Sequence, residues 1–402
     1  MDSNPPTTLP PSGGPLEKET RKTIRTFALA SFLNDLGSDM IYPIWPLFVT
    51  TILGANMAAL GFIDGLGDAI VSISQAISGF ISDKIKKRKV FVWTGYLFGS
   101  LSRIGYALST VWQHLIPFKV LDRAGKIRSA PRDAIIADIS TIENRGRSFG
   151  LLRAMDNLGA VFGVIICILF FNLLGYRNLF LLAALPSAIG AFLIFSSVKE
   201  KKPTEIEIYK GFSLRAFDKN FKLFLVLSAI FALGSFSYSF LLIFAKKVGF
   251  QIGFVPILYL IFTAIASLFS LPFGKLSDRI GRRSVIILSF IFWVIVCLIF
   301  IFTQNYFAII LAFVLYGLHR GALEPVQKTF VSEISPLDYR ASGLGGFQMI
   351  IGLCALPSSL IAGILWDKIN IFAPFYLSLI LTILSIMMLM FVKERKSKPP
   401  KI

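Results

Sequence analysis

Long apolar runs recur along this chain, and they constrain its fold more than any other feature. Residues 221–244, 254–273, 285–302 and 371–392 carry almost no charged side chain. Each run is long enough to cross a bilayer, which takes about 20 residues of helix. Because lipid offers no hydrogen-bond partners, a spanning segment must satisfy its backbone amides internally, and this favours helices over open strands. The sequence therefore predicts an all-α membrane protein.

Shorter or more polar segments complete a set of twelve predicted spans. The composition agrees, because 55% of the 402 residues are hydrophobic and only 16% are charged, whereas soluble domains contain about 25% charged residues. A soluble chain this apolar could not bury its side chains, but a bilayer accepts them. The predicted spans are 25–52, 58–82, 90–110, 113–138, 146–174, 178–198, 221–245, 252–273, 285–303, 306–332, 341–366 and 371–392.

Basic side chains collect in alternate connections between these spans. With the N-terminus placed in the cytoplasm, the inside connections hold clusters at 84–89, 145–147, 199–222, 275–283 and 393–401. This asymmetry follows the positive-inside rule. It explains the net charge of +18 by topology rather than by nucleic-acid binding. We expect a multi-pass protein of the inner or plasma membrane with both termini in the cytoplasm. The outside connections hold only Arg177, Lys246, Lys247 and Lys368.

The chain divides into five predicted regions. Residues 1–22 are rich in Pro, Ser and Thr and then charged, so they cannot bury a core and are interpreted as a disordered cytoplasmic tail. Two six-helix bundles follow, at 23–198 and 221–395. The charged linker between them, 199–220, fits a disordered loop as well as it fits a surface helix, and both alternatives stay open. Residues 396–402 form a short cytoplasmic tail.

An internal repeat relates the two bundles. Five residues recur in identical or similar form after the same interval of 195 positions, and five coincidences at one interval indicate a duplicated six-helix unit. Such repeats are typical of secondary transporters, whose site lies between the repeats. The pairs are Gly79 and Gly274, Asp83 and Asp278, Arg88 and Arg283, Asp138 and Glu333, and Arg145 and Arg340.

The repeated loop resembles a known family motif. The second copy, from Gly274 to Arg283, resembles the G-x-L-a-D-R-x-G-R-R/K loop of the major facilitator superfamily nearly throughout, and the first copy has Lys86 where the family usually has glycine. The chain resembles this family over residues 25–395. The resemblance implies twelve transmembrane helices in two pseudo-symmetric six-helix bundles (the MFS fold) and transport of a small solute by alternating access.

In the family, this loop cluster latches the two halves together at the cytoplasmic side. Glycine lets helix ends approach, aspartate at a helix end can accept bonds from a neighbouring helix N-terminus, and arginine pairs with carboxylates. We therefore assign gating to ten residues, with topological charge and helix capping as the alternative. They are Gly79, Asp83, Arg88, Asp138, Arg145, Gly274, Asp278, Arg282, Glu333 and Arg340.

Ionisable residues inside the predicted spans gather in the N-terminal half, and such residues are functional candidates because they are costly in lipid. The C-terminal half has only one cluster, His319, Arg320 and Glu324. We infer that coupling chemistry lies mainly in the N-terminal half and that the C-terminal half supplies an apolar, aromatic wall. The N-terminal set is Asp35, Asp39, Asp64, Asp68, Asp122 and Asp156 with Arg103, Lys119, Arg123 and Arg153, of which Arg103, Arg153 and Asp156 are interpreted as structural.

The family resemblance selects a smaller set for substrate binding and proton coupling, because helices one, four, seven and ten line the cavity in that family. A carboxylate in a low-dielectric cavity can hold a proton near neutral pH, and an adjacent arginine would favour its release. The hypothesis is proton coupling through Asp35 with Arg123, and the alternative is a buried structural ion pair. The selected residues are Asp35, Asp39, Asp122, Arg123, Arg320 and Glu324.

The direction of transport is weakly indicated. The segment from Gly159 to Gly163 partly resembles the helix-five signature of antiporters in the family but lacks its proline. It favours efflux of a drug or metabolite. The alternative is an importer or facilitator of an organic anion, an iron chelate or another metabolite, with Arg123 and Arg320 as facing clamps. A non-transporting receptor would have no need to bury these charges.

Other functions are disfavoured by what the chain contains. His114 and His319 are its only histidines, and no metal-ligand cluster or nucleophile motif accompanies them, so we expect no enzyme, metal or cofactor. Cys167, Cys297 and Cys354 lie in apolar stretches without CxxC spacing and are interpreted as packing residues without disulfides. The expected partners are a small-molecule substrate, protons and the lipid bilayer, with no nucleic acid, and we expect a monomer.

Overall fold

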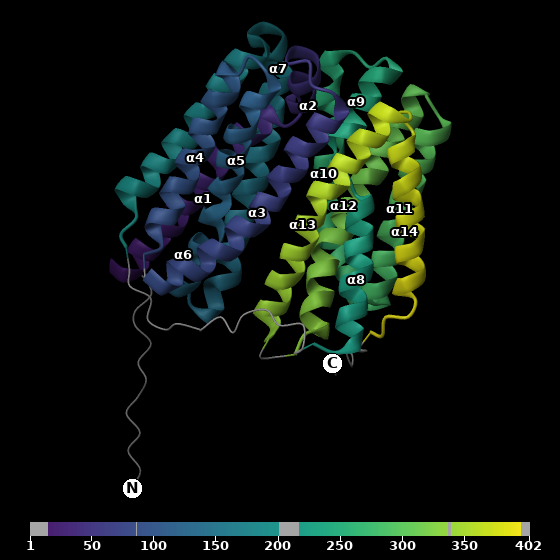
Figure 1. The fold of residues 1–402 in the computed structure, drawn as a ribbon. Coiled ribbons are helices and arrows are strands. Elements are labelled where there is room, and N and C mark those ends of the chain that lie inside the picture. Colours follow the sequence, from purple (N-terminus) through teal and green to yellow (C-terminus); the bar gives the residue numbers. More distant parts are fainter. Residues whose placement is uncertain (1–14, 86, 201–216, 337–338, 395–402) are drawn as a thin grey trace.

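The computed structural model describes residues 15–85, 87–200, 217–336 and 339–394, and over these residues it contains helices and no strand. The predicted all-α fold is confirmed. Two helical bundles stand side by side, one formed by each half of the chain (Figure 1). Most of the predicted N-terminal tail and linker, and all of the predicted C-terminal tail, lie outside the described residues.

The N-terminal half contains the helices from α1 to α7, with short 3-10 or π segments between some of them. Its elements are α1 (Pro15–Ile41), α2 (Trp45–Leu47), η1 (Phe48–Ile52), α3 (Met57–Ile85), α4 (Lys89–Leu108), η2 (Trp112–His114), α5 (Leu115–Ala124), η3 (Gly125–Arg128), α6 (Ser129–Ile139) and α7 (Ile142–Ser197).

The C-terminal half contains the helices from α8 to α14. Its elements are α8 (Lys219–Gly234), α9 (Ser239–Val248), η5 (Ile252–Phe254), α10 (Val255–Ile280), α11 (Arg282–Phe302), α12 (Tyr306–Ile334), α13 (Arg340–Lys368) and α14 (Ala373–Leu389).

Helices account for all twelve predicted spans, although several are joined or interrupted. Among the described residues, seven helical segments are long and apolar enough to cross a membrane, and the longest of them, in α7, covers the predicted spans 146–174 and 178–198. It bends at Gly175, whose φ of 66° is a conformation that glycine adopts readily. The predicted spans 25–52, 113–138 and 221–245 are each divided into shorter helical pieces. This arrangement is consistent with twelve crossings.

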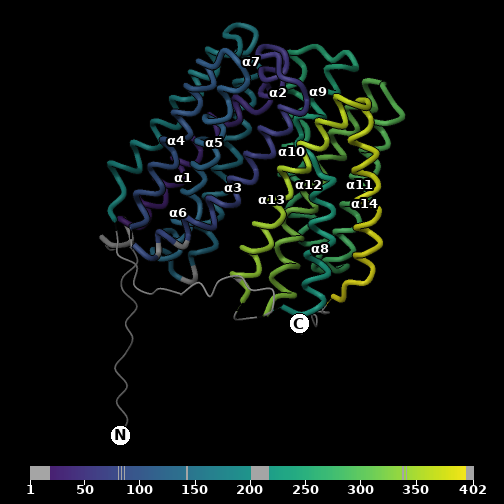
Figure 2. Tube along the Cα trace, viewed as in Figure 1, coloured from purple at the N-terminus to yellow at the C-terminus, as the bar shows by residue number. Residues whose placement is uncertain are grey.

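Both described ends of the chain lie at one end of the molecule. Pro15 begins α1 and Glu394 follows α14, and Figures 1 and 2 show both at the bottom of the bundles, which we call the termini end. The two halves diverge toward this end and meet toward the other, which we call the opposite end.

A glycine seam joins the halves toward the opposite end, where α3 packs against α13. A Cβ atom on Gly65 would lie 2.6 Å from the carbonyl oxygen of Ala355. Gly61 and Gly363 are held as tightly against backbone atoms of the other helix. Small residues of this kind let two helices approach closely in lipid. No side chain fits in this seam while the two helices stay in contact.

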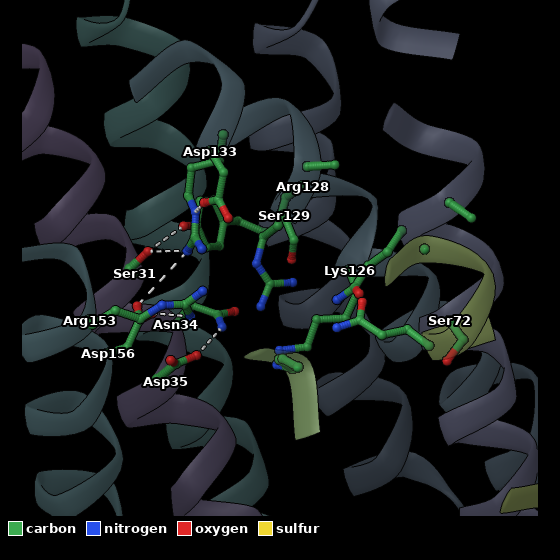
Figure 3. A pocket seen from close by; sticks show the side chains of 18 residues that line it. Ser31, Asn34, Asp35, Ser72, Lys126, Arg128, Ser129, Asp133, Arg153 and Asp156 are labelled. Atoms are coloured by element: carbon green, nitrogen blue, oxygen red, sulfur yellow. Dashed lines mark hydrogen bonds and ion pairs between the residues drawn. The ribbon is translucent and has the colours of Figure 1, made fainter. Parts of the chain in front are cut away.

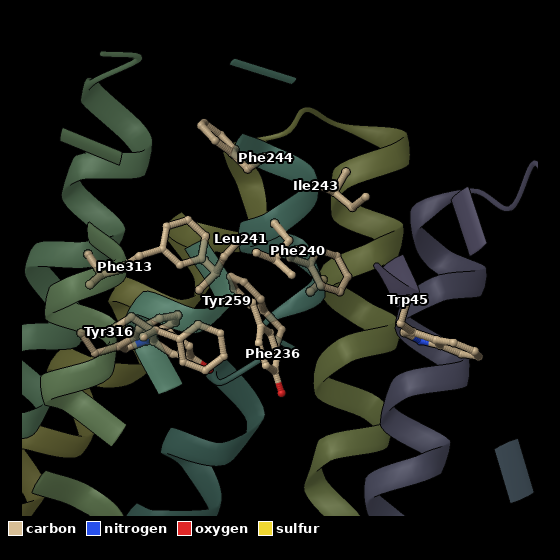
Figure 4. Packing of buried hydrophobic residues seen from close by; sticks show 14 of the residues in the cluster. Trp45, Phe236, Phe240, Leu241, Ile243, Phe244, Tyr259, Phe313 and Tyr316 are labelled. Atoms are coloured by element: carbon tan, nitrogen blue, oxygen red, sulfur yellow. The ribbon is translucent and has the colours of Figure 1, made fainter. Parts of the chain in front are cut away.

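Aromatic side chains fill the core of the C-terminal half (Figure 4). The ring of Phe244 packs edge-on against Phe300 at a centroid distance of 4.9 Å, and Phe236 packs similarly against Trp293 at 5.9 Å. The indole of Trp293 donates a hydrogen bond to the hydroxyl of Ser378 at 2.8 Å, so its one polar atom is satisfied. This core makes the C-terminal half a rigid wall beside the more polar N-terminal half.

Candidate transport site

A cavity of about 510 Å³ lies between the halves, toward the termini end (Figure 3). Its walls come from α1, α3, α4, η3, α6 and α7 of the N-terminal half and from α12 and α13 of the C-terminal half. The lining is polar and carries more basic than acidic side chains. The basic ones are Lys126, Arg128, Arg132, Arg153 and Lys328, and the acidic ones are Asp35, Asp133 and Asp156.

Two of the three acidic side chains are engaged by arginines of the same wall. The carboxylate of Asp133 accepts a hydrogen bond from Arg132 at 3.0 Å. Asp156 pairs with Arg153 at 3.4 Å and with Arg132 at 3.9 Å. These pairs are drawn as dashed lines in Figure 3. The predicted structural pair of Arg153 and Asp156 therefore forms, and it also lines the cavity.

Asp35, the third acid, lies on the cavity wall apart from Arg123. Its carboxylate accepts a hydrogen bond from the amide of Asn34 at 2.8 Å. Arg123 instead lies 3.6 Å from the carboxylate of Asp122 and donates to the hydroxyl of Tyr42 at 3.2 Å. The hypothetical pair of Asp35 with Arg123 is thus not formed in this conformation, because their side chains have other partners.

A second polar centre lies around Asp64, between the halves. Asp64 accepts hydrogen bonds from the indole of Trp45 at 2.9 Å and from the ammonium of Lys119 at 3.1 Å, both in its own half. It also accepts from the hydroxyls of Ser237 at 2.8 Å and Ser239 at 2.5 Å, at the interruption between α8 and α9. Only 7% of the Asp64 side-chain surface is exposed. One buried carboxylate therefore binds the two halves together.

Asp39 makes a similar connection from α1. Its carboxylate is buried and accepts a hydrogen bond from the hydroxyl of Tyr259 on α10 at 3.0 Å. Asp39 was selected from the family resemblance as a coupling residue, and the structure places it between the halves.

The remaining selected residues lie on α12. Arg320 and Glu324 form an ion pair one helical turn apart, and 47% and 55% of their side-chain surfaces are exposed.

The gating residues of the N-terminal half meet at the termini end. Arg88, at the start of α4, pairs with Asp138 of α6 at 2.5 Å. The carboxylate of Glu200 accepts from the backbone amides of Arg88 at 2.7 Å and Lys89 at 3.1 Å, which caps α4. Arg145 donates to the carbonyl of Ala137 at 3.1 Å.

The C-terminal half repeats this arrangement with a shift of one residue. Arg282 pairs with Glu333 at 3.0 Å and with Asp278 at 2.6 Å, and the carboxylate of Glu394 accepts from the backbone amides of Arg282 and Arg283. By its contacts the counterpart of Arg88 is therefore Arg282, not Arg283, at an interval of 194 positions. The interval of 195 that pairs Arg88 with Arg283 therefore does not match these contacts, because Arg88 precedes α4 whereas Arg282 is the first residue of α11.

The role expected for the two motif glycines differs from the structure. A Cβ on Gly79 would meet only Ala130 at an ordinary 3.5 Å, and one on Gly274 would meet nothing within 4 Å. Close helix approach is therefore not what these glycines provide in this conformation. Arg340 begins α13 and is exposed, and the Asp83 side chain lies outside the described part of the structure.

The gating ion pairs of the described residues each join elements of one half. Arg88 with Asp138 lies in the N-terminal half, and Arg282 with Glu333 lies in the C-terminal half. In this conformation these pairs brace each bundle internally, and a latch between the bundles remains a prediction for a conformation closed at the termini end.

Sequence reasoning missed Asp64 as a site residue, together with its serine partners. Asp64 was recognised as a charge inside a span, but the family pattern selects cavity residues from other helices. The signal that could have found it is the presence of an acid and a base, Asp64 and Lys119, inside two of the predicted spans. Ser237 and Ser239 carry no such signal, because serine is common in membrane helices.

A two-bundle fold with a polar cavity between the bundles defines a secondary transporter rather than an enzyme. The chain belongs to the Major Facilitator Superfamily, whose family model matches residues 27–255 and 223–402. An uncharacterized MFS-type transporter of Methanocaldococcus jannaschii is 37% identical over 385 residues, covering 94% of this chain and 96% of its own. The protein is therefore a membrane transporter of a small-molecule solute.

More distant similarities also cover nearly the whole chain. The quinolone resistance protein NorA of Staphylococcus aureus is 23% identical over 377 residues, which covers 91% of this chain and 95% of NorA. Among solved structures, the nucleoside transporter NupG is similar with a TM-score of 0.72 and 16% identity, over 92% of this chain and 97% of NupG. The match to NupG concerns the fold.

Proposed function

We propose that this transporter exports a small organic solute by alternating access and that protons move in the opposite direction. The observation that carries the proposal is the asymmetry of the central space. A polar cavity lies between the halves toward the termini end, while buried carboxylates and the glycine seam hold the halves together toward the opposite end.

Hydrogen bonds between the halves hold the opposite end closed, and they would break if this end opened. The carboxylate of Asp367 on α13 accepts from the backbone amides of Met57 at 3.2 Å and Ala58 at 2.8 Å, and so caps α3 of the other half. Lys246 donates to Thr51 at 2.7 Å nearby. An opening at this end would break these bonds, and closure at the termini end would have to replace them.

Proton coupling is inferred from two further contacts between the halves, those of Asp39 and Asp64. Asp39 and Asp64 are buried and would lose partners from the other half if the opposite end opened. A buried charge without its partners is costly. Protonation of Asp39 removes that cost, so a proton taken up at this carboxylate would favour the open state at the opposite end, whereas Asp64 would keep Lys119 as its partner. Proton binding and the change of access would then be linked.

The direction rests on orientation. The basic clusters favour a cytoplasmic termini end by the positive-inside rule, and in that orientation the cavity would load from the cytoplasm. The similarity to NorA, which is named for quinolone resistance, is in keeping with export.

The test is solute-driven proton movement in proteoliposomes that contain a pH-sensitive dye. Wild-type protein should acidify or alkalinise the lumen when a transported solute is added, and Asp39→Asn should reduce the rate roughly tenfold or more while solute binding persists. A matched control is Asp218→Asn, because Asp218 caps α8 and asparagine caps a helix equally well. Full coupling in Asp39→Asn would remove this residue from the mechanism.

The second candidate is import or facilitation of an organic anion, an iron chelate or another metabolite. The excess of basic over acidic side chains in the cavity favours an anionic solute. Preloaded vesicles distinguish the two candidates, because an exporter that is inserted with its cytoplasmic face outward accumulates solute when the lumen is acidic. A facilitator only equilibrates it.

A further inference from the structure

We propose that the cavity binds an organic anion, and that Lys126 of the N-terminal half and Lys328 of the C-terminal half hold its charged group between them. This inference rests on the proposed transport function and names the chemical class of its solute.

The charges of the cavity wall do not balance. Asp133 and Asp156 are matched by Arg132 and Arg153, which leaves Asp35 against three further basic side chains. Arg128 is held in place, since it donates to the carbonyl of Gly125 at 2.8 Å and lies 4.9 Å from the ring of Tyr96. The other two bases are Lys126 and Lys328.

Both lysines face the cavity without a carboxylate partner. Among the described residues, no carboxylate oxygen lies within 4.0 Å of the ammonium nitrogen of Lys126 or Lys328. Figure 3 shows Lys126 and Arg128 directed toward the interior of the cavity. Unpaired cations in a confined space of low dielectric repel each other and concentrate anions. A bound anion would supply the missing charge.

The uncharged lining residues fit a polar ligand. Gln75 and Ser72 on α3 face Gln348 on α13, and Ser129 begins α6, so hydrogen-bond donors and acceptors are available from both halves. The cavity volume of about 510 Å³ suits a small molecule rather than a peptide or polymer. Lysine contributes a compact charge on a flexible stem, which tolerates carboxylate or phosphate groups in several orientations.

The position of the two lysines links binding to movement. Lys126 and Lys328 belong to different halves, so closure of the termini end would bring like charges together. An anion between them would replace this repulsion with attraction and lower the cost of closure. The loaded carrier would therefore close more readily than the empty one. Export of an anion is further favoured by an inside-negative membrane potential.

The experiment measures thermal unfolding of the purified full-length protein in nanodiscs with a panel of small anions. The panel contains inorganic phosphate, succinate, citrate and benzoate, and each organic acid is matched by its neutral amide at constant ionic strength. Variants Lys126→Gln, Lys328→Gln and the double variant are compared with Lys275→Gln, which changes a lysine at the termini end of α10 outside the cavity lining.

We expect at least one anion to raise the melting temperature of wild type and Lys275→Gln more than its amide does. Each cavity substitution should weaken the apparent affinity about tenfold or more, as expected for loss of a charged hydrogen bond. The proposal is overturned if no anion stabilises wild type more than its amide, or if the double variant binds as tightly as wild type.

The same proteoliposome assay separates this inference from the proposed transport function. Solute-driven proton flux that is confined to neutral or cationic compounds would refute the anion and leave proton-coupled transport standing. Anion binding that depends on both lysines, without any solute flux, would refute transport and leave the site.

Discussion

Asp64 illustrates how single side chains determine the behaviour of this protein. Its carboxylate is shared between Lys119 and Trp45 in one half and two serines in the other. Lys119 also lies 4.0 Å from the ring of Trp45 and has only 3% of its side-chain surface exposed. Such a buried ion pair is strongly coupled, because removal of one partner leaves the other charge buried and unmatched.

Asp64→Asn is expected to destabilise the protein by about 3–5 kcal/mol, since Lys119 would keep a buried charge without a carboxylate. Calorimetry or thermal unfolding in nanodiscs measures the effect. The double variant Asp64→Asn with Lys119→Met should recover much of the loss, because no unmatched charge then remains. Additive effects of the two substitutions would contradict the proposed dependence.

At the scale of elements, the contact of α3 with α13 decides which end of the molecule is closed. Gly61 and Gly65 of α3 lie against backbone atoms of Ser359, Ala355 and Leu356. Because backbone meets backbone, any added side chain must push the two helices apart.

Gly61→Leu is therefore expected to open the opposite end, by favouring the conformation in which α3 and α13 separate. Thiol labelling of a cysteine introduced at Met57, which is 5% exposed and lies against Gly363 in the seam, should become at least several-fold faster in a background without the native cysteines. Gly146→Leu is the matched control, because a Cβ at Gly146 meets nothing within 4 Å. Unchanged labelling in a folded Gly61→Leu protein would show that the seam is not a barrier to opening.

At the scale of the whole molecule, the protein consists of two similarly braced bundles, and we expect them to move relative to each other. Each bundle has its own internal ion pair, Arg88 with Asp138 in the N-terminal half and Arg282 with Glu333 in the C-terminal half. Each also has an equivalent helix cap, from Glu200 and from Glu394. These contacts keep each bundle rigid, so a change of access is expected to occur between bundles rather than within them.

Spin-label pairs across the bundles test this expectation. A pair at Lys84 and Lys275, both at the termini end, should approach when a transported solute is added, and a pair at Val111 and Gln251 at the opposite end should separate. Pulsed electron paramagnetic resonance measures both distances. Shifts of the same sign at the two ends would contradict a rocking movement, while labels placed within one bundle should show no change.

The sequence predicted the architecture well, because hydropathy and the internal repeat are properties of short segments. The family resemblance selected Asp39 for coupling, and this residue contacts Tyr259 of the other half, while its coupling role stays a prediction. The sequence could not predict the Asp64 centre, since Ser237 and Ser239 reach that carboxylate only after two distant segments pack together. Nor could the sequence identify Arg282, rather than Arg283, as the partner of Glu333, because the motif contains two adjacent arginines and is compatible with either. The placement of Lys126 and Lys328 in the wall of one cavity likewise could not be predicted without the fold, because they lie in different halves of the chain.

The glycine seam also has a consequence for rotation of one half of the protein against the other. The contact continues along α3 from Gly61 as far as Ser72, which touches α13 at Gly352, and Ser72 also lines the cavity. A pivot at this point would have long lever arms on both sides. A rotation that moves the binding residues only slightly would then move the two ends of the pathway much farther. The solute would change from exposure on one side of the membrane to exposure on the other while staying almost in place.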